Sequence, residues 1–244
     1  MNRRAQIIVA LLTALLAVSC SHKDSPAPQL KPTAFGSAIV ESSGGKQNSQ
    51  TGAPLPQPLV VQVNDDHGAI VPGALVEFSG APEMIFDPAQ GLTDSSGQVS
   101  TNVTLGNLAG RYQFTAFTRD KTRKKIALTI EEIALGYEQT LGRQLNDQYC
   151  ERCHNPESTV ERVSNFDNLE IKPHPFTDGD TLNKISDADL IAIISHGGAA
   201  LNKSALMPAW GNTLSKSDIQ ALISYIRAIS DPPHRNAGPV YAAD

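Results

Sequence analysis

The stretch YCERCHN (149–155) places two cysteines two residues apart, with a histidine directly after the second. Three chemistries use such a pattern: half of a zinc site, a dithiol redox pair, or a haem attached covalently to the chain. Each of them requires different partners elsewhere in the sequence, so the rest of the chain decides between them.

The cysteine content separates these possibilities. The chain has 244 residues and three cysteines, Cys20, Cys150 and Cys153. A structural zinc site usually takes four ligands, and the sequence has no second C-x-x-C and no H-x-x-x-H cluster. A thioredoxin-like pair follows a strand in a βαβ unit, whereas these cysteines close a segment of helical period. C-x-x-C-H is the haem c attachment signal, so we predict thioethers at both cysteines and an iron ligand at His154.

The sequence from about residue 135 onward predicts helices. LGYEQTLGRQLNDQYC (135–150) has a helical hydrophobic period. SDADLIAIISHGG (186–198) begins with Ser186 as N-cap and ends on two glycines. SKSDIQALISYIRAIS (215–230) is capped by Ser215 or Ser217 and is followed by two prolines. This part of the chain is therefore expected to be all-α.

A low-spin electron-transfer haem needs a sixth ligand. Met207 lies in LMPAWG, on an expected loop before the last helix, and its thioether is the predicted distal ligand. The alternatives are a core role for this methionine, or ligation by His174 or His196. With both His154 and Met207 on the iron no position is open to substrate, which favours electron transfer over catalysis. Five side chains are candidates for the haem pocket: Trp210, Leu206, Ile171, Phe176 and Ile193.

The preceding part of the chain has the pattern of a β-sandwich. Short alternating stretches are separated by Gly, Pro and Asp turns such as NDDHG (64–68) and TDSSG (93–97). Strands are expected at 59–63, 74–80, 98–105, 111–118 and 124–133.

The N-terminus has the features of an export signal. Two arginines precede an apolar run over 7–18, and small residues follow up to Cys20. The run is short for a membrane span. The ending LLAVSC resembles a bacterial lipoprotein signal, in which the cysteine is lipidated; a plain secretory signal cleaved near 17–19 is the alternative. Residues 21–33, rich in Pro, Ser and Lys, are expected to be a flexible tether.

Residues 135–230 resemble the small soluble class I c-type cytochromes. In that family a G-x-x-L-[aromatic]-x-x-x-C helix precedes the haem motif, and Gly142 to Cys150 has this spacing, with Asn146 in place of the aromatic residue. The family's M-P-x-[FW]-G loop is matched at 207–211, and its terminal helix at 222–227. The resemblance implies an all-α domain with one haem.

Residues 34–133 are similar to bacterial Ig-like domains of the invasin/intimin type. The D-x-x-G-x-x-V-P-G hairpin of that family is matched at 65–73, and its T-D-x-x-G hairpin at 93–97. This resemblance implies a spacer or adhesive module rather than an enzyme.

Together these features predict a multidomain β + α protein. The expected parts are a lipoprotein signal (1–20), a tether (21–33), an Ig-like β-sandwich (34–133), a cytochrome c domain (134–230) and a disordered tail (231–244).

We expect a membrane-tethered monohaem cytochrome that exchanges electrons with a redox partner protein at the bacterial cell envelope. It would be held at the outer rather than the inner membrane and face the periplasm or the cell surface. The alternatives are an adhesion or redox-sensing lipoprotein, or an electron-entry subunit of an oxidoreductase. With a net charge of −5 and no long basic run, we expect no nucleic-acid partner.

Overall fold

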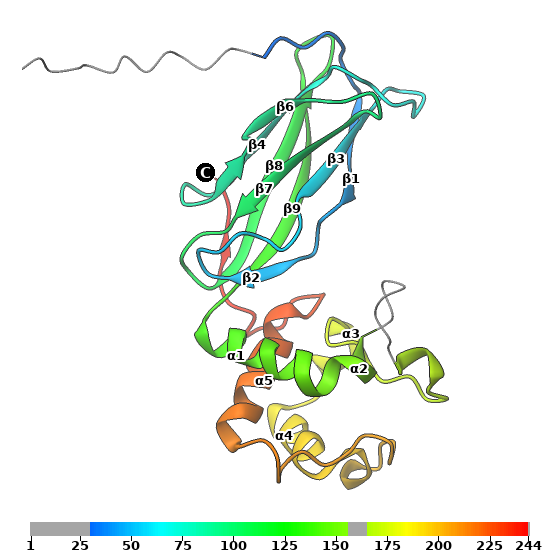
Figure 1. Ribbon diagram of the computed structural model, residues 1–244, viewed down its shortest axis with the longest axis vertical. Coiled ribbons are helices and arrows are strands. Elements are labelled where there is room, and N and C mark those ends of the chain that lie inside the picture. Colours follow the sequence, from blue (N-terminus) through cyan, green and yellow to red (C-terminus); the bar gives the residue numbers. More distant parts are fainter. Residues whose placement is uncertain (1–29, 156–164, 244) are drawn as a thin grey trace, which may run out of the picture.

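A computed structural model describes residues 30–155 and 165–243 (Figure 1). It has a β-rich half followed by a helical half, which confirms the predicted fold class. The strands of the first half are β1 (Ala38–Ser43), β2 (Asn48–Gln50), β3 (Leu59–Asn64), β4 (Leu75–Ser79), β5 (Ile85–Asp87), β6 (Gln90–Leu92), β7 (Gln98–Thr104), β8 (Gly110–Arg119) and β9 (Lys125–Leu135).

Two sheets pack face to face in this half. One has the strand order β1-β3-β7-β5, and the other has the order β2-β9-β8-β4-β6. β3 alternates strictly between buried and half-buried residues, as a strand with one face on a core should. The core between the sheets is built mainly of aliphatic and aromatic side chains, including Leu59, Val61, Val63, Val76, Phe78, Val103, Tyr112 and Phe114.

Aspartates lock three of the turns that join these strands. Oδ1 of Asp65 accepts backbone N–H bonds from His67 and Ala69, and Asp94 and Asp120 make the same pattern in their own turns. These Asx turns stabilise the reversals of the chain through local hydrogen bonds. The turns predicted at 64–68 and 93–97 are therefore present, and their glycines Gly68 and Gly97 have φ of 82° and 72°.

The helical half surrounds a second core. Its helical elements are α1 (Tyr137–Leu145), a π-helical turn (Asn146–Cys150), α2 (Glu151–His154), a 3₁₀ turn (Phe166–Asn168), α3 (Gly179–Leu182), α4 (Asp187–His196), a 3₁₀ turn (Gly198–Leu201) and α5 (Lys216–Ile229). Ser186 caps α4 and Ser215 caps α5, each accepting a bond from the N–H three residues on. The predicted helix starts are thus confirmed, and Ser215 rather than Ser217 is the cap.

α1 and α5 cross in close contact at Gly142. A β-carbon on Gly142 would lie 2.0 Å from the carbonyl oxygen of Ala221 and 2.7 Å from Cβ of Tyr225. Only glycine permits the two backbones to approach this closely. The contact between the first and last helices is therefore made by glycine, although Asn146 occupies the position where an aromatic residue is usual.

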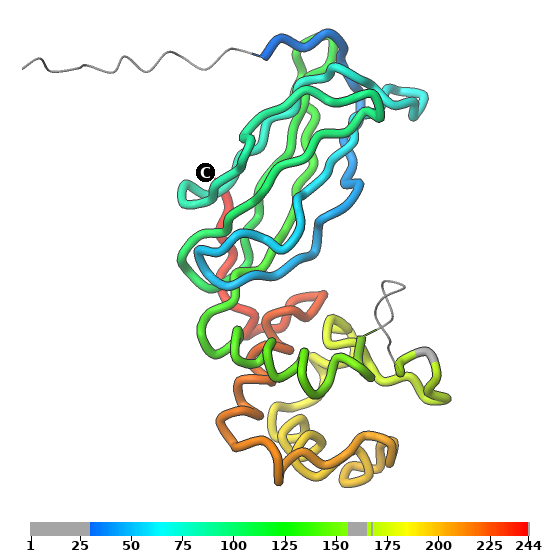
Figure 2. Tube along the Cα trace, viewed as in Figure 1, coloured from blue at the N-terminus to red at the C-terminus, as the bar shows by residue number. Residues whose placement is uncertain are grey.

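The C-terminal segment differs from the expected disordered tail. Residues Val240–Tyr241 form β10, which pairs in parallel with Arg111 and Tyr112 of β8. The Tyr241 ring lies 4.9 Å from that of Tyr112. Figure 2 shows the red C-terminal segment returning from the helices to the sandwich. β8 is ten residues long and β4 pairs only with its 115–117 part, so its other end has a free edge that accepts the tail.

The two halves share a tight interface. Gly136 alone separates β9 from α1. The guanidinium of Arg111, 4% exposed, donates to the carbonyls of Ala228 and Ser230 at the end of α5 and pairs with Glu131. Leu135 packs with apolar residues of α5. These contacts fix the helical half to one end of the sandwich (Figure 1).

Within the described ranges, no helix is long and apolar enough to cross a membrane. The predicted lipoprotein signal, its Cys20 and the tether up to residue 29 lie outside those ranges.

Candidate metal centre

The C-x-x-C-H motif spans the turn from the π-helical segment into α2. Asn146–Cys150 adopts the rare π form and Glu151–His154 continues as α-helix. π-helical turns recur at functional sites. Cys150 is buried in the helical core and Cys153 is half-buried, and both thiols are free. The motif is therefore not held as a disulfide.

The Cys150 thiol has the opposite character to that of a redox-active cysteine. Burial raises the pKa of Cys150 to about 12, and the neighbouring Cys153 adds to the shift. Thiol–disulfide exchange needs a lowered pKa and an accessible thiolate. The structure thus gives no support to Cys150 as the attacking thiol of a redox pair.

His154 is oriented by a backbone carbonyl. Its Nδ1 lies 2.9 Å from the carbonyl oxygen of His174. Because a carbonyl only accepts, Nδ1 carries the proton, and in the neutral ring Nε2 keeps its lone pair. Burial lowers the pKa of His154, which favours this neutral form. A second-shell acceptor that fixes the tautomer is typical of a histidine metal ligand.

The segment 174–178 supplies that acceptor. Asp178 is the N-cap of α3, accepting from the Thr181 N–H at 3.1 Å, and its other oxygen lies 2.8 Å from Nδ1 of His174. The ring of Phe176 lies 4.6 Å from that of His154. The sequence pointed to Phe176 as a pocket residue and to His174 as an alternative ligand, but it did not point to Asp178 or to the backbone carbonyl that orients His154. The only signal for them in the sequence was the helix-start pattern at Asp178.

This arrangement argues against His174 as the distal ligand. Its carbonyl contacts the Nδ1 side of His154, opposite Nε2, and its own ring is engaged with Asp178. His196, the other alternative, is exposed at the C-terminal end of α4.

Met207 belongs to the same core cluster as Cys150. Its side chain is half-buried and packs against the cluster that also contains Leu190, Ile194 and Leu214. The rings of Tyr149 and Trp210 lie 5.3 Å apart and join the cysteine segment to the methionine loop. One predicted attachment cysteine, Cys150, and the predicted distal ligand, Met207, thus meet in one apolar cluster, and Phe176, which packs against this cluster, also contacts the ring of His154.

Glycines allow the methionine loop to fold onto the end of α4. A β-carbon on Gly198 would lie 2.2 Å from the carbonyl oxygen of Ser204, and Gly197 has a φ of 83°. The N–H of Gly198 donates to the carbonyl of Met207, at 3.1 Å. The Gly-Gly pair therefore ends the helix and also positions the loop.

The predicted pocket residues divide into two groups. Trp210 and Phe176 pack against the cluster, and Ile193 is half-buried. Leu206 and Ile171 are each 68% exposed. The prediction that they line the packed pocket was therefore wrong.

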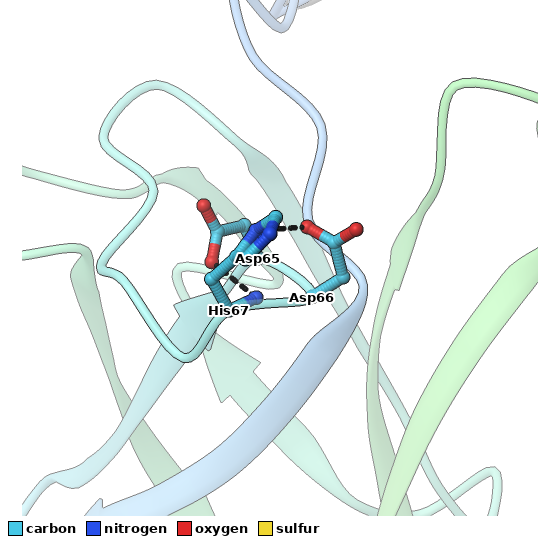
Figure 3. Close-up of side chains that lie close together, drawn as sticks. All are labelled: Asp65, Asp66 and His67. Atoms are coloured by element: carbon cyan, nitrogen blue, oxygen red, sulfur yellow. Dashed lines mark hydrogen bonds and ion pairs between the residues drawn. The ribbon is translucent and has the colours of Figure 1, made fainter.

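A second group of metal-ligand side chains lies in the sandwich half (Figure 3). Ligand atoms of Asp65, Asp66 and His67 are within 4.8 Å of one another. All three belong to one turn, where Asp65 is engaged with backbone N–H groups and Nδ1 of His67 lies 2.8 Å from Asp66. His67 and Asp66 are largely exposed, and the hydrogen bonds of the turn account for the grouping of the three side chains.

Comparisons with known proteins bear on both halves. Residues 138–226 match the family described as cytochrome C oxidase, cbb3-type, subunit III, which confirms the predicted c-type cytochrome domain. Such a domain implies a haem protein that transfers electrons. No curated protein matches the chain.

Solved structures similar to this chain include intimin and invasin-type proteins. The D00-D0 domain of intimin is 12% identical, with 44% of this chain and 50% of that chain covered and a TM-score of 0.32. The D0-D1 domain of intimin is 16% identical, with coverages of 42% and 48% and a TM-score of 0.33. The adhesin InvE of Yersinia pseudotuberculosis is 16% identical, with coverages of 41% and 32% and a TM-score of 0.31. The chain spans half or less of the length of these structures.

Proposed function

We propose that this protein is a membrane-tethered monohaem c-type cytochrome that carries electrons to or from a partner protein at the bacterial cell envelope. The observation that carries the proposal is the surroundings of His154. Its tautomer is fixed by the His174 carbonyl, and it directly follows the C-x-x-C pair, whose first cysteine, Cys150, lies in the core cluster against which Met207 packs.

The donor set suits a covalently attached haem. Cys150 and Cys153 would form the thioethers, His154 would bind the iron through Nε2, and Met207 would supply a second iron ligand. Bound there, a haem c provides a one-electron carrier, and a methionine ligand raises its potential relative to two histidines.

The protein's own residues determine how this site behaves. Asp178 and the His174 carbonyl hold the His154 ring in place, so little rearrangement is needed when the charge of the site changes. Tyr149, Trp210 and Phe176 cover part of the cluster with aromatic surface. If His154 and Met207 both bound the iron, the site would transfer electrons and leave no position for substrate.

The proposed tether rests on the N-terminal sequence, where LLAVSC resembles a lipoprotein signal. A lipid on Cys20 would hold the chain at a membrane, and the Ig-like half would separate the haem domain from the lipid. Mass spectrometry of the N-terminal peptide tests the lipid, since a diacylglyceryl cysteine at residue 20 is expected and an unmodified N-terminus would remove the tether from the proposal.

The optical spectrum tests the haem site. The protein is made in a host with haem c maturation, as wild type, Met207→Ala and the neighbouring exposed control Leu206→Ala. We expect a low-spin reduced spectrum in wild type and control, and a weak far-red ferric band that is lost only in Met207→Ala. A high-spin wild type would favour a ligand-binding or catalytic haem, and a spectrum indifferent to Met207→Ala would remove this ligand. Absence of covalent haem in the wild type would overturn the proposal.

A further inference from the structure

The hairpin between β8 and β9 concentrates positive charge. Five of the seven residues from 119 to 125 are basic, while the whole chain carries a net charge of −5. All five side chains are exposed: Arg119, Lys121, Arg123, Lys124 and Lys125. Asp120 is the single acidic residue of the hairpin. A local excess of this kind attracts anionic partners.

The tip of this hairpin is ordered rather than loose. Asp120 Oδ1 accepts from the N–H groups of Thr122 and Lys124, at 2.8 and 2.9 Å, and from the Thr122 hydroxyl at 2.7 Å. Arg123 takes a left-handed conformation, with φ of 67°, and donates its N–H to the Asp120 carbonyl. The basic side chains therefore project from a fixed turn, and the one carboxylate in the hairpin is turned inward to its own backbone.

The charges of the hairpin are available for an external partner. In the part of the chain that the structure describes, none of the five basic residues lies within salt-bridge distance of a carboxylate. Lys125 Nζ lies 4.1 Å from the centre of the Phe117 ring, and Arg119 lies 5.7 Å from it. Lys121, Arg123 and Lys124 have no such contact and form the outermost part of the hairpin.

The hairpin lies at the end of the sandwich where the described chain begins. Ala34 bridges to Ala74, directly before β4, and β4 pairs with β8 so that Glu77 is opposite Phe117. Continuing this register brings the start of β4 beside Arg119. The helical half joins the opposite end, where Gly110 pairs with Ala134 (Figure 1). Chain start and hairpin thus face one way, and the cytochrome domain faces the other.

We propose that the β8–β9 hairpin lies against the anionic phosphate headgroups of the membrane that holds the protein. This inference rests on the proposed lipid anchor at Cys20. Ten residue steps separate Cys20 from Leu30, the first described residue, and such a segment spans at most about 36 Å. A lipid on Cys20 would keep the N-terminal end of the sandwich, and the hairpin with it, close to the bilayer surface.

Whether an anionic surface attracts or repels the hairpin depends on all charged residues at the same end of the sandwich. Asp65, Asp66 and Asp94 lie in neighbouring turns and oppose the attraction, while Lys31 adds to it. Asp94 is engaged with its own turn, as Asp120 is. A basic side chain near an anionic surface strengthens binding by roughly fivefold. The five basic hairpin residues and Lys31 carry six positive charges, and Asp65, Asp66, Asp94 and Asp120 carry four negative ones, so this end of the sandwich keeps a net positive charge of two.

Vesicle binding of the unlipidated protein tests this proposal separately from the anchor. The haem-loaded chain from residue 21 onward is exported behind a signal peptide that is cleaved without lipidation. It is co-sedimented with phosphatidylcholine vesicles, with or without phosphatidylglycerol. The hairpin variant is Lys121→Gln/Arg123→Asn/Lys124→Gln, in which asparagine suits the left-handed position. The control removes the same charge from the other half, as Lys203→Gln/Lys216→Gln/Arg235→Gln.

We expect wild type and control to bind vesicles containing phosphatidylglycerol at low ionic strength and to be released at about 1 M salt, where the Debye length is about 3 Å. The hairpin variant should bind at least tenfold more weakly. Equal binding to neutral vesicles, no binding to anionic ones, or an equal loss in the control variant would overturn the inference. Because the haem spectrum and the lipid at Cys20 are measured separately, failure here leaves those results unaffected.

Discussion

Glu132 allows the energetics of the sandwich to be tested through pH. Its side chain is 0% exposed in β9, where one oxygen accepts from the Gln47 N–H and the other has no partner within the described ranges. Burial raises the pKa of Glu132 to about 8, from an ordinary value of 4.5, and the nearby charges of Glu41 and Glu131 add to the rise. A carboxyl group held in this way is protonated in the folded protein at neutral pH.

The direction of the resulting pH dependence follows from proton binding. Between pH 4.5 and about 8 the folded protein holds a proton on Glu132 that the unfolded chain has released. The folded state binds more protons, so the free energy of unfolding falls as pH rises, by about 1.4 kcal/mol per unit. Across the whole window the loss from this one group reaches about 5 kcal/mol.

The substitution Glu132→Gln should remove this dependence. The amide retains an acceptor for Gln47 but cannot ionise. We expect the variant to match wild type within about 1 kcal/mol near pH 5 and to be several kcal/mol more stable near pH 8.5. Urea unfolding followed by far-UV circular dichroism measures the difference, while haem absorbance reports on the cytochrome domain. Glu83→Gln, on an exposed loop, is the matched control. Parallel pH profiles for wild type and Glu132→Gln would refute the reasoning.

Two further substitutions test the contacts that position the haem domain. Gly142→Ala places a methyl group 2.0 Å from the Ala221 carbonyl oxygen, so the free energy of unfolding of the cytochrome domain should fall by about 1–3 kcal/mol in thermal unfolding. The exposed control Gln144→Ala should leave it unchanged, and an unchanged midpoint in both variants would contradict the close crossing. Arg111→Met leaves the Glu131 carboxylate and the carbonyls of Ala228 and Ser230 without their donor. The free energy of unfolding measured in urea should fall by about 3–5 kcal/mol, and proteolysis after residue 230 should become faster. Arg119→Met, in the same strand but exposed, is its control, and equal proteolysis of the two variants would show that Arg111 does not hold the halves together.

The sequence predicted those elements that carry a local signal. β3, β7, β8 and β9 have alternating residues, and α4 and α5 carry serine caps, so they were found with small errors at their ends. β2, β5 and β6 are three residues each, which is too short for a period to be visible. β10 is two residues long and pairs with a strand over 120 residues earlier, so it is determined by the free edge of β8 rather than by its own sequence.

The same distinction applies to the candidate site. Cys150, Cys153, His154 and Met207 were visible because their side-chain chemistry and spacing form motifs. The acceptor that orients His154 is a backbone carbonyl, and any residue at position 174 could provide it. Its placement depends on how the segment 174–178 is fixed by the start of α3 and by hydrogen bonds to Asp231. Such second-shell groups are determined by tertiary structure and leave little trace in a single sequence.

The length of β8 relates the position of the basic hairpin to that of the haem domain. β8 runs from Gly110, at the interface with the helices, to Arg119, at the basic hairpin, and nine residue steps in a strand extend about 30 Å. The contacts of Arg111 and β10 make this separation rigid at one end. If the hairpin rests on the headgroups, the height of the haem domain is set by β8 and not by the length of residues 21–33. The near edge of the haem domain then lies roughly 30 Å from the hairpin, so a partner embedded in the membrane would need a domain that projects at least that far.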